Sequence, residues 1–280
     1  MTFRSILFVP ADRPERFEKA MASAADALIL DLEDSVASEK KDFARDAVRD
    51  FLSGSHQKPV TVRVNPLGSA FLPADLKALE GLTPDGLILP KAEGASDVKR
   101  LDDFYPGQLP PVLPVATETP AAVFELGTFR EVAHHLMGLT WGAEDLPAAI
   151  GASTARESDG RYTSPYEMVR NLTLFAAHAA GVPAIETVYP NIKDEAGLAA
   201  YAARGARDGF TAMIAIHPAQ CALINDAFTP GEEDINRAQA IVDAFAANPG
   251  VGALKLDGQM IDAPHLKQAQ ALLNRVRETR

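Results

Sequence analysis

Short runs of aliphatic and β-branched residues recur along this chain of 280 residues, and Gly, Pro or Asp residues bound them. Buried strands of a parallel sheet have this pattern because both of their faces are covered. The pattern predicts eight strands, at residues 6–9, 27–31, 60–65, 86–90, 112–118, 136–141, 184–188 and 211–216.

The segments between these runs carry Ala, Leu, Phe and charged residues at helical spacing, as at residues 14–24, 39–52, 119–134 and 165–180. Eight strands that alternate with helices over about 250 residues are typical of a (β/α)8 TIM barrel. We therefore expect an α/β chain with a barrel at residues 1–245 and a C-terminal helical extension at residues 246–280. Within the extension, three Gly and two Pro predict a loop at 248–264, and a tail helix follows at 263–277.

A doubly wound open sheet is the alternative architecture for the same alternation. That fold places a Gly-rich turn after its first strand to hold a dinucleotide phosphate. The corresponding segment here, Val9-Pro10-Ala11-Asp12-Arg13, contains no glycine. The barrel is therefore favoured.

Composition narrows the possible partners and compartment. The chain has 38 acidic against 27 basic residues and a net charge of −11, which argues against nucleic acid as a partner. Cys221 is the single cysteine, so no internal disulfide forms, and its apolar neighbours predict buried packing. No apolar run approaches the ~20 residues of a membrane span, and the first run is too short for a signal peptide. We expect a cytoplasmic protein with no membrane association.

Polar residues gather where the predicted strands end, which is the edge of a barrel that carries the active site. They are Asp31 and Glu33 after the second strand, Arg63 in the third, Lys91 after the fourth, Glu118 after the fifth, Glu144 and Asp145 after the sixth, Glu186 in the seventh and His217 after the eighth. Carboxylates that meet at one mouth repel each other unless a cation lies between them, and oxygen ligands suit Mg²⁺ or Mn²⁺. No Cys/His cluster with zinc spacing is present.

Arg63 and residues 142–145 each have two possible interpretations. If Val62 and Val64 face the helices, Arg63 points into the barrel, either as a salt bridge to Asp31 or Glu33 or as a clamp on a substrate carboxylate or enolate. Residues 142–145 are either a backbone nest for an anion or an ordinary helix start.

Two further types of catalysis are disfavoured. Lys91 occupies a position where a Schiff-base lysine could lie, but the nearby Glu93 would keep it charged. The chain contains no Gly-x-Ser-x-Gly motif of a serine hydrolase. By spacing alone, Asp262 is a helix cap.

Eight short motifs occur in an order that resembles a known family. They are Leu7-Phe8-Val9-Pro10, Leu30-Asp31-Leu32-Glu33-Asp34-Ser35-Val36, Val62-Arg63-Val64-Asn65, Leu89-Pro90-Lys91, Glu118-Thr119-Pro120, Gly142-Ala143-Glu144-Asp145-Leu146, Ile216-His217-Pro218-x-Gln220 and Leu256-Asp257-Gly258-Gln259-Met260-Ile261-Asp262-x-Pro264. Together they resemble the citrate lyase beta-subunit-like CoA-ester lyases of the HpcH/HpaI aldolase and citrate lyase superfamily. The resemblance covers nearly the whole chain.

The resemblance implies a (β/α)8 barrel, usually a homotrimer, that holds Mg²⁺ through Glu118 and Asp145. It also implies that the 2-oxo acid bridges the metal and lies against Arg63. Backbone amides around Ala143, Glu144 and Asp145 would hold the carboxylate of that acid. These five residues form the implied substrate-binding set.

The resemblance assigns roles to four further residues. Asp262 would reach the site of a neighbouring subunit as general acid or base, which makes the C-terminal extension a lid. Asp31 and Glu33 would support the residues that contact the substrate. Glu186 stands where the family more often has aspartate, so we expect a reshaped pocket on that side.

The implied activity is Mg²⁺-dependent cleavage of a carbon–carbon bond in a 3-hydroxyacyl-CoA thioester of the citryl-, malyl- or citramalyl-CoA type. The products are an acyl-CoA and a 2-oxo acid such as oxaloacetate, glyoxylate or pyruvate. Residues 156–162 resemble stand-alone members and favour a free enzyme. Two alternatives are thioester hydrolysis at the same site and a citrate lyase complex subunit that serves an acyl-carrier protein.

Overall fold

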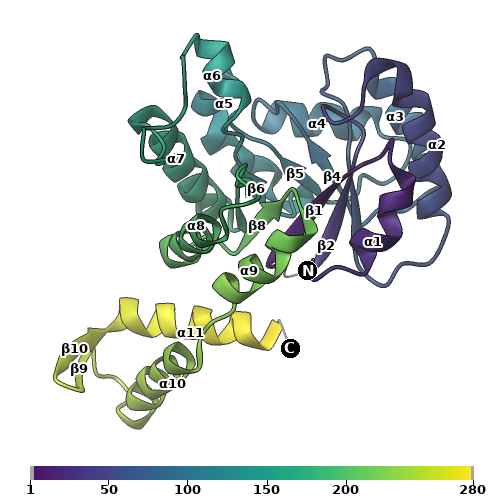
Figure 1. The fold of residues 1–280 in the computed structure, drawn as a ribbon. Coiled ribbons are helices and arrows are strands. Elements are labelled where there is room, and N and C mark those ends of the chain that lie inside the picture. Colours follow the sequence, from purple (N-terminus) through teal and green to yellow (C-terminus); the bar gives the residue numbers. More distant parts are fainter. Residues whose placement is uncertain (1–2, 279–280) are drawn as a thin grey trace.

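Eight parallel strands form a closed barrel in the computed structural model, which describes residues 3–278 (Figure 1). Hydrogen-bonded neighbours follow the order β5-β4-β3-β2-β1-β8-β7-β6, and bridges from Val112 to Leu136 and from Val115 to Thr140 join β5 to the β6 side. The strands are β1 Ser5–Pro10, β2 Ala27–Asp31, β3 Val60–Arg63, β4 Gly86–Leu89, β5 Val112–Pro114, β6 Leu139–Thr140, β7 Ala184–Glu186 and β8 Ala212–Ala215. This ring confirms the predicted barrel and excludes the open sheet.

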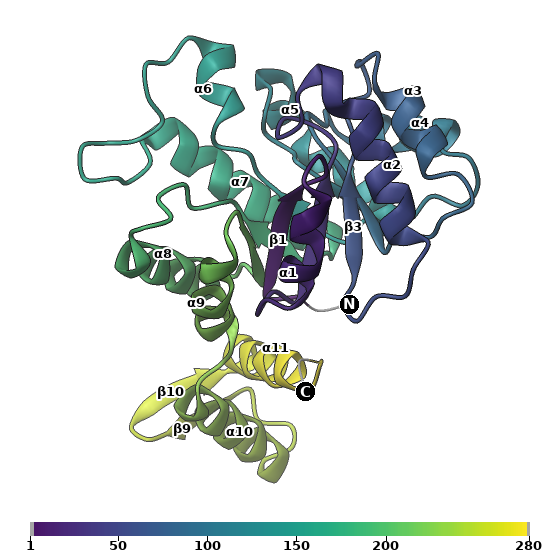
Figure 2. The same ribbon diagram turned by 45° about the vertical axis from the view of Figure 1, so that its right-hand side comes forward.

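Helices follow the strands and cover the outside of the barrel (Figures 1 and 2). The α-helices are α1 Phe17–Met21, α2 Lys41–Leu52, α3 Leu72–Ala78, α4 Ala95–Phe104, α5 Pro120–Glu125, α6 Asp145–Ile150, α7 Ser164–Ala180, α8 Glu195–Asp208, α9 Pro218–Phe228, α10 Glu232–Ala247 and α11 Ala263–Glu278. The described part of the chain has three 3-10 helices, η1 Pro14–Arg16, η2 Ser38–Lys40 and η3 Leu126–His135, so the helix expected at 119–134 is α5 continued by η3. Among residues 3–278, no helix is long and apolar enough to cross a membrane.

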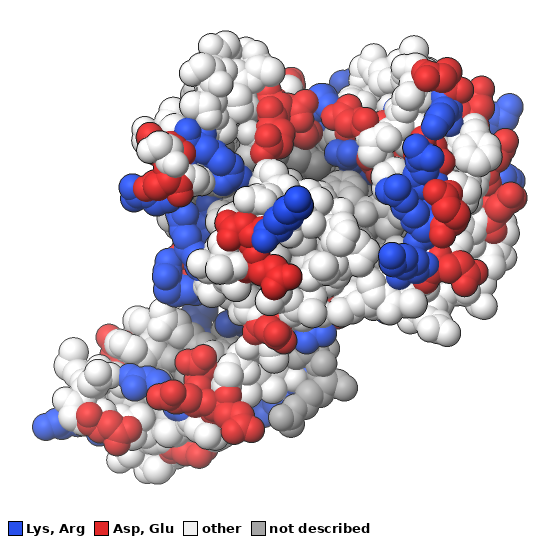
Figure 3. Space-filling view, viewed as in Figure 1, with Lys and Arg blue, Asp and Glu red and all other residues white. Residues whose placement is uncertain are grey.

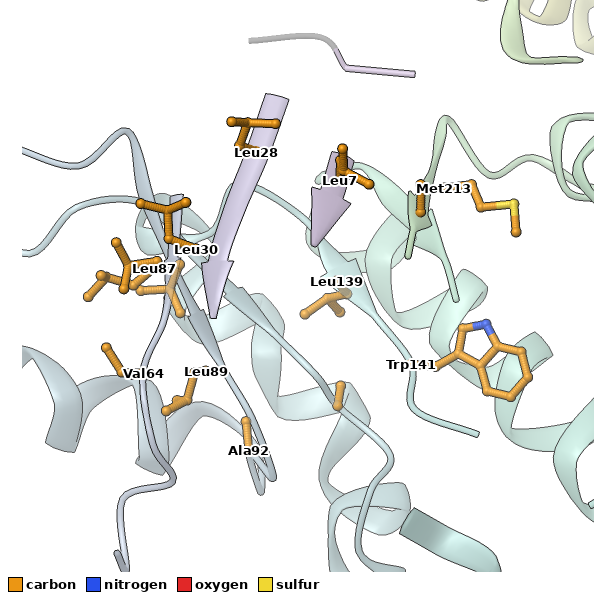
Figure 4. Close-up of a cluster of buried hydrophobic side chains, with 14 of the residues drawn as sticks. Leu7, Leu28, Leu30, Val64, Leu87, Leu89, Ala92, Leu139, Trp141 and Met213 are labelled. Carbon is orange, nitrogen blue, oxygen red and sulfur yellow. The ribbon is translucent and has the colours of Figure 1, made fainter. Parts of the chain in front are cut away.

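Alternate positions of each strand face two different cores. In β2, Leu28 and Leu30 belong to the layer between barrel and helices, whereas Ala27 and Ile29 belong to the cluster inside the barrel. Figure 4 shows part of the outer layer, with Leu7 from β1, Leu28 and Leu30 from β2, and Leu87 and Leu89 from β4. Burial on both faces explains why the strands read as continuous apolar runs. Cys221 in α9 is also buried, as predicted, and burial raises the pKa of its thiol to about 11.

The C-terminal lobe comprises α10, β9 (Ala253–Leu256), β10 (Gln259–Asp262) and α11. These elements share a small core of Ala238, Ile241, Ile261 and Ala269. Helix α10 was expected in the barrel, because the predicted boundary lay at 245/246, but it packs on α11 and β9. The lobe therefore begins near residue 231, after the segment that ends α9.

The expected loop at 248–264 contains an antiparallel hairpin of β9 and β10. Its turn is Asp257-Gly258, and both residues have positive φ, 46° and 81°. A two-residue Asp-Gly turn of this kind matches the twist of antiparallel strands, so the dipeptide was a hairpin signal. In both ribbon views the hairpin lies at the end of the molecule opposite α6 (Figures 1 and 2).

Candidate active site

A pocket of about 330 Å³ lies at the mouth formed by the carboxyl ends of the strands. Figure 3 shows a hollow at this end, bordered by acidic and basic side chains. The lining residues come from seven of the eight strands or the segments that follow them, all except β4, and they include Phe8, Asp31, Asp34, Arg63, Glu118, Trp141, Ala143, Glu144, Asp145, Thr187, Val188 and Ile214. Of the side chains predicted from strand ends, Asp31, Arg63, Glu118, Glu144 and Asp145 line this pocket, whereas Glu33, Lys91, Glu186 and His217 do not.

Arg63 is held by two carboxylates at the pocket wall. Its Nε and Nη2 atoms each donate to Asp31 at 2.6 Å, and Nη1 lies 3.0 Å from Glu33 Oε2. Val62 and Val64 pack outward, so Arg63 points inward as predicted, with its guanidinium 4.6 Å from the ring centre of Phe8. Burial alone would lower the pKa of Arg63, but the bonds and charge of Asp31 and the charge of Glu33 raise it.

Asp31 is buried and anchors the loop after β2. Besides Arg63 it accepts the backbone N–H groups of Glu33 at 2.8 Å and Ser35 at 3.1 Å. Burial would raise its pKa, yet these hydrogen bonds and the Arg63 charge lower it below the ordinary value. Asp31 therefore remains ionised and fixes both Arg63 and the following loop.

Lys91 follows β4 in a left-handed backbone conformation, with φ 53°. Its N–H donates to Glu118 Oε2 at 2.6 Å, and its ammonium lies 2.7 Å from Glu33 Oε1 and 3.4 Å from Asp145 Oδ1. Burial by itself would lower the pKa of Lys91. The neighbouring carboxylates outweigh this effect and raise the pKa above its ordinary value, so the ammonium stays charged. A permanently charged lysine is a poor Schiff-base nucleophile, in agreement with the prediction.

Glu118 is 6% exposed and passes directly beneath the start of the β6–α6 connection. A Cβ atom on Gly142 would lie 2.5 Å from Glu118 Cγ, so only glycine fits at this position. Burial, together with the charge of Asp145, raises the pKa of Glu118 to about 8. Asp145, the first residue of α6, lies on the same pocket.

Two carboxylates that disfavour each other's charge are suited to a shared cation. Within residues 3–278, no group of three or more His, Cys, Asp or Glu side chains is placed to hold a metal. Mg²⁺, however, commonly uses one or two protein carboxylates and takes its other oxygens from water and substrate. Glu118 and Asp145 fit such an ion.

Residues 142–145 form the connection between β6 and α6. Ala143 is buried and Glu144 is exposed at the start of α6, and both line the pocket. The N–H of Gly142 donates to Thr117 Oγ1 at 3.1 Å, so this N–H is used within the protein and is not directed at an anion in the pocket. The helix-start reading of this segment therefore holds for Glu144 and Asp145.

Glu186 lies outside the pocket, contrary to expectation. Ile185 faces the inside of the barrel, so Glu186 faces the helices. There it accepts Trp141 Nε1–H at 2.6 Å, Tyr201 O–H at 2.8 Å and Arg170 Nε–H at 2.7 Å, all buried or nearly so. Glu186 is connected to the site through Trp141, which is one of the residues that line the pocket.

Asp262, the remaining predicted site residue, is far from this pocket in its own chain. It ends β10 in the C-terminal lobe, and its carboxylate lies 2.5 Å from His265 Nδ1. None of the described residues that line the pocket belongs to this lobe. Asp262 also immediately precedes α11, as its sequence context predicted.

Sequence reasoning missed the central position of Lys91 and the roles of Phe8 and Trp141 as walls. The sequence places Lys91 among the polar residues at the strand ends, but nothing in it indicates that Lys91 contacts both Glu118 and Asp145. Nothing local in the sequence reports that Trp141 and Phe8 flank the same cavity.

Known proteins resemble this chain in sequence over nearly its full length. Residues 4–218 match the profile of the family described as HpcH/HpaI aldolase/citrate lyase. The citrate lyase subunit beta-like protein of Mycobacterium tuberculosis is 39% identical over 97% of this chain and 95% of its own length. A (3S)-malyl-CoA thioesterase of Cereibacter sphaeroides is 33% identical (97% and 93%), and mitochondrial citramalyl-CoA lyase of Rattus norvegicus is 32% identical (96% and 85%).

Solved structures show the same likeness in three dimensions. The CitE protein of Mycobacterium tuberculosis, in complex with magnesium, acetoacetate and coenzyme A, superposes with a TM-score of 0.86 at 36% identity and covers 99% of this chain and 98% of that one. A citrate lyase beta subunit from the same organism, complexed with oxaloacetate and magnesium, gives a TM-score of 0.72 at 38% identity over 82% and 98%.

Proposed function

Because the chain belongs to the HpcH/HpaI aldolase/citrate lyase family, we propose that it is a Mg²⁺-dependent lyase of CoA thioesters. The proposed substrate is a 3-hydroxyacyl-CoA of the citryl-, malyl- or citramalyl-CoA type, cleaved to an acyl-CoA and a 2-oxo acid. The observation that carries this proposal is the convergence of Arg63, Glu118 and Asp145 on one pocket. The relatives include a citramalyl-CoA lyase and proteins solved with magnesium, coenzyme A and oxaloacetate.

Glu118 and Asp145 are the proposed ligands of the Mg²⁺ ion. When bound, the ion acts as a Lewis acid on the oxygen of the substrate that becomes the 2-oxo carbonyl. The protein contributes the ligand arrangement: Lys91 holds one oxygen of Glu118, and the absence of a side chain at Gly142 leaves room for that carboxylate. Glu118, whose pKa burial raises to about 8, would be held in its ionised form by a bound cation.

Arg63 is the proposed partner of the oxo-acid end of the substrate. Its guanidinium carries five N–H groups, and the contacts to Asp31 and Glu33 leave donors for a substrate carboxylate. Because Asp31 accepts two hydrogen bonds from one edge of the guanidinium and Glu33 pairs with Nη1, the arginine is already ordered before substrate binds. Backbone amides near Ala143, Glu144 and Asp145 complete the proposed carboxylate site.

Asp262 of a neighbouring copy is the proposed proton carrier. In the cleavage, the 3-hydroxyl group loses its proton, the electrons of the carbon–carbon bond pass to the thioester enolate, and protonation of the enolate carbon releases acyl-CoA. The lobe that carries Asp262 lies at the opposite end of its own barrel (Figure 1). A homotrimer in which each lobe covers the next mouth would supply this residue.

The decisive test incubates the purified protein with Mg²⁺ and, separately, citryl-CoA, malyl-CoA and citramalyl-CoA, with a chelator control. The 2-oxo acid and free thiol are followed together. We expect oxo acid without thiol, abolished by the chelator, for one of the three substrates. Oxo acid that survives chelation, or its absence with all three, contradicts the proposal.

A second candidate activity is hydrolysis of the same thioesters at this site. The 33% identity to a (3S)-malyl-CoA thioesterase favours it, and a metal-bound water would be the nucleophile. Free thiol together with 3-hydroxy acid, and no oxo acid, would identify this reaction. Turnover only after addition of an acyl-carrier protein would instead identify a subunit of a larger lyase.

A further inference from the structure

Lys91 contacts both proposed metal ligands through two different chemical groups. Its backbone N–H donates to Glu118 Oε2 at 2.6 Å, and its ammonium lies 3.4 Å from Asp145 Oδ1. In residues 3–278, it is the one residue whose hydrogen bonds and ion pairs reach both carboxylates. The two ligands lie 27 and 54 positions further along the chain, so Lys91 joins three segments of the mouth.

The strained backbone conformation of Lys91 indicates that its side chain has a functional role. With φ 53° it occupies the left-handed region, which costs energy for any residue that carries a Cβ atom. Glycine would adopt this conformation without strain. Strained residues of this kind cluster at functional sites, where the surrounding structure holds them in place.

The ammonium group joins a partly exposed ligand to a buried part of the barrel. Asp145 begins the short helix α6, and its side chain is 35% exposed. Glu33, 2.7 Å from the Lys91 ammonium, is buried and is itself held by Arg63. Lys91 thus connects Asp145 to the Asp31–Glu33–Arg63 cluster and restricts where its carboxylate can point.

We propose that Lys91 is a positioning residue that orients Asp145 beside Glu118 for binding of a divalent cation; this inference rests on the proposed function. Lys91 does not line the pocket, so it acts through the two carboxylates. Its charge alone would have the opposite effect, because a cation 3.4 Å from Asp145 repels an incoming metal ion. The sign of the change in metal affinity therefore separates positioning from simple charge.

The test measures Mn²⁺ binding without substrate, by electron paramagnetic resonance of the free ion. We expect Lys91→Met to weaken binding by about 10- to 100-fold, the range for residues that orient metal ligands, and Lys91→Arg to restore part of the loss. Lys99→Met removes the same charge from an exposed site on α4 and should bind as the wild type does. Unchanged or tighter binding by Lys91→Met would overturn the proposal.

A double-mutant cycle with Asp145→Asn tests whether the Lys91 side chain works through Asp145. In the Asp145→Asn protein, Lys91→Met should cause no further loss of Mn²⁺ affinity. An equal loss in both backgrounds would contradict the proposal. Circular dichroism verifies folding, and Lys91→Gln replaces Lys91→Met if the latter unfolds. Absence of Mn²⁺ binding by the wild type would reject the proposed function itself, whereas wild-type binding without a Lys91 effect rejects only this inference.

Discussion

Arg63 forms the buried ion pairs with Asp31 and Glu33 at the mouth of the barrel. It is 14% exposed, and it neutralises Asp31, which is 1% exposed. A buried carboxylate without its partner is costly because water can no longer solvate the charge. Sequence alone left open whether Arg63 serves the fold or the substrate; the structure shows the salt bridges and also places the guanidinium on the pocket.

Replacing Arg63 by Met should lower the free energy of unfolding by about 3–5 kcal/mol, because Asp31 is left buried and unpaired. Urea unfolding measures the change. Arg100→Met is the matched control, since Arg100 forms an exposed pair with Asp97 on α4 and should cost about 0–1 kcal/mol. An equal loss of unfolding free energy in the two variants would show that the buried pair stabilises the fold no more than an exposed one.

The Glu118 carboxyl makes the stability of the metal-free protein depend on pH. Burial raises its pKa to about 8 from the ordinary 4.5, so the unfolded chain ionises first. The contribution of the neutral carboxyl is fully present below pH 4.5 and is lost as the pH rises to about 8. Ionisation in the folded state then requires a partner, which Mg²⁺ would provide.

In the presence of a chelator, Glu118→Gln should therefore melt at a higher temperature than the wild type, by a margin that grows from pH 5 to pH 8. The margin amounts to at most about 1.4 kcal/mol per pH unit, or roughly 2–4 °C per kcal/mol. Mg²⁺ should reverse the order, since only the wild type can bind it. Glu131→Gln, an exposed carboxylate, should show no such trend. A margin that stays constant with pH would contradict the raised pKa.

At the scale of elements, the β6–α6 connection brings Asp145 to the site and lets Glu118 pass under it. The close approach depends on Gly142, where an added Cβ would meet Glu118 Cγ at 2.5 Å. The φ of Gly142 is not positive, so the requirement is one of space and not of backbone conformation. The element itself therefore sets the position of one proposed ligand relative to the other.

Gly142→Ala should displace the Glu118 carboxylate and weaken Mn²⁺ binding at least about tenfold, while overpacking costs about 1–3 kcal/mol of stability. A Mn²⁺ titration and a thermal melt separate the two effects. Gly127→Ala is the control because no heavy atom lies within 4 Å of its added Cβ. Wild-type affinity in Gly142→Ala would show that Glu118 is not a ligand.

At the scale of the whole molecule, the C-terminal lobe has its own core and shares few contacts with the barrel of the same chain. Its hairpin exposes Met260 and carries Asp262 at the end opposite the mouth (Figure 2). A residue in this place can serve a mouth only if that mouth belongs to another copy. The notion that the lobe acts as a lid on a neighbouring subunit remains a prediction.

Mixing two inactive variants tests that arrangement. Asp262→Asn lacks the proton carrier and Asp145→Asn lacks a metal ligand, so in a head-to-tail ring each can supply what the other lacks. Co-expression of equal amounts should recover about a quarter of wild-type activity, because both the lobe and the barrel of a site must be intact. Asp145→Asn mixed with Glu118→Gln damages the same barrel site twice and should recover nothing. Recovery in neither mixture would place Asp262 in the site of its own chain, and full activity of Asp262→Asn alone would place it outside the reaction.

The sequence by itself determined the order of strands and helices, the closed barrel and the family. Burial on both faces leaves an apolar run at each strand, and the strand ends share one edge, so local pattern places Arg63, Glu118 and Asp145 among the site candidates. The resemblance to the family singles these three out from the other strand-end residues. The match of residues 4–218 confirms the family that the motifs indicated. Strand alternation also indicates that Glu186 faces outward, because its neighbour Ile185 faces the inside of the barrel.

Only the tertiary structure decided the contacts between residues far apart in the chain. Lys91 reaches Glu33 and Asp145 across more than fifty positions in either direction, and no period in the sequence records such a meeting. Helix α10 has the same amphipathic character whether it covers a barrel or a small lobe, so its partner could not be inferred. Periodicity reports which face of an element is buried, whereas the identity of what covers that face is set by the packing of the whole chain.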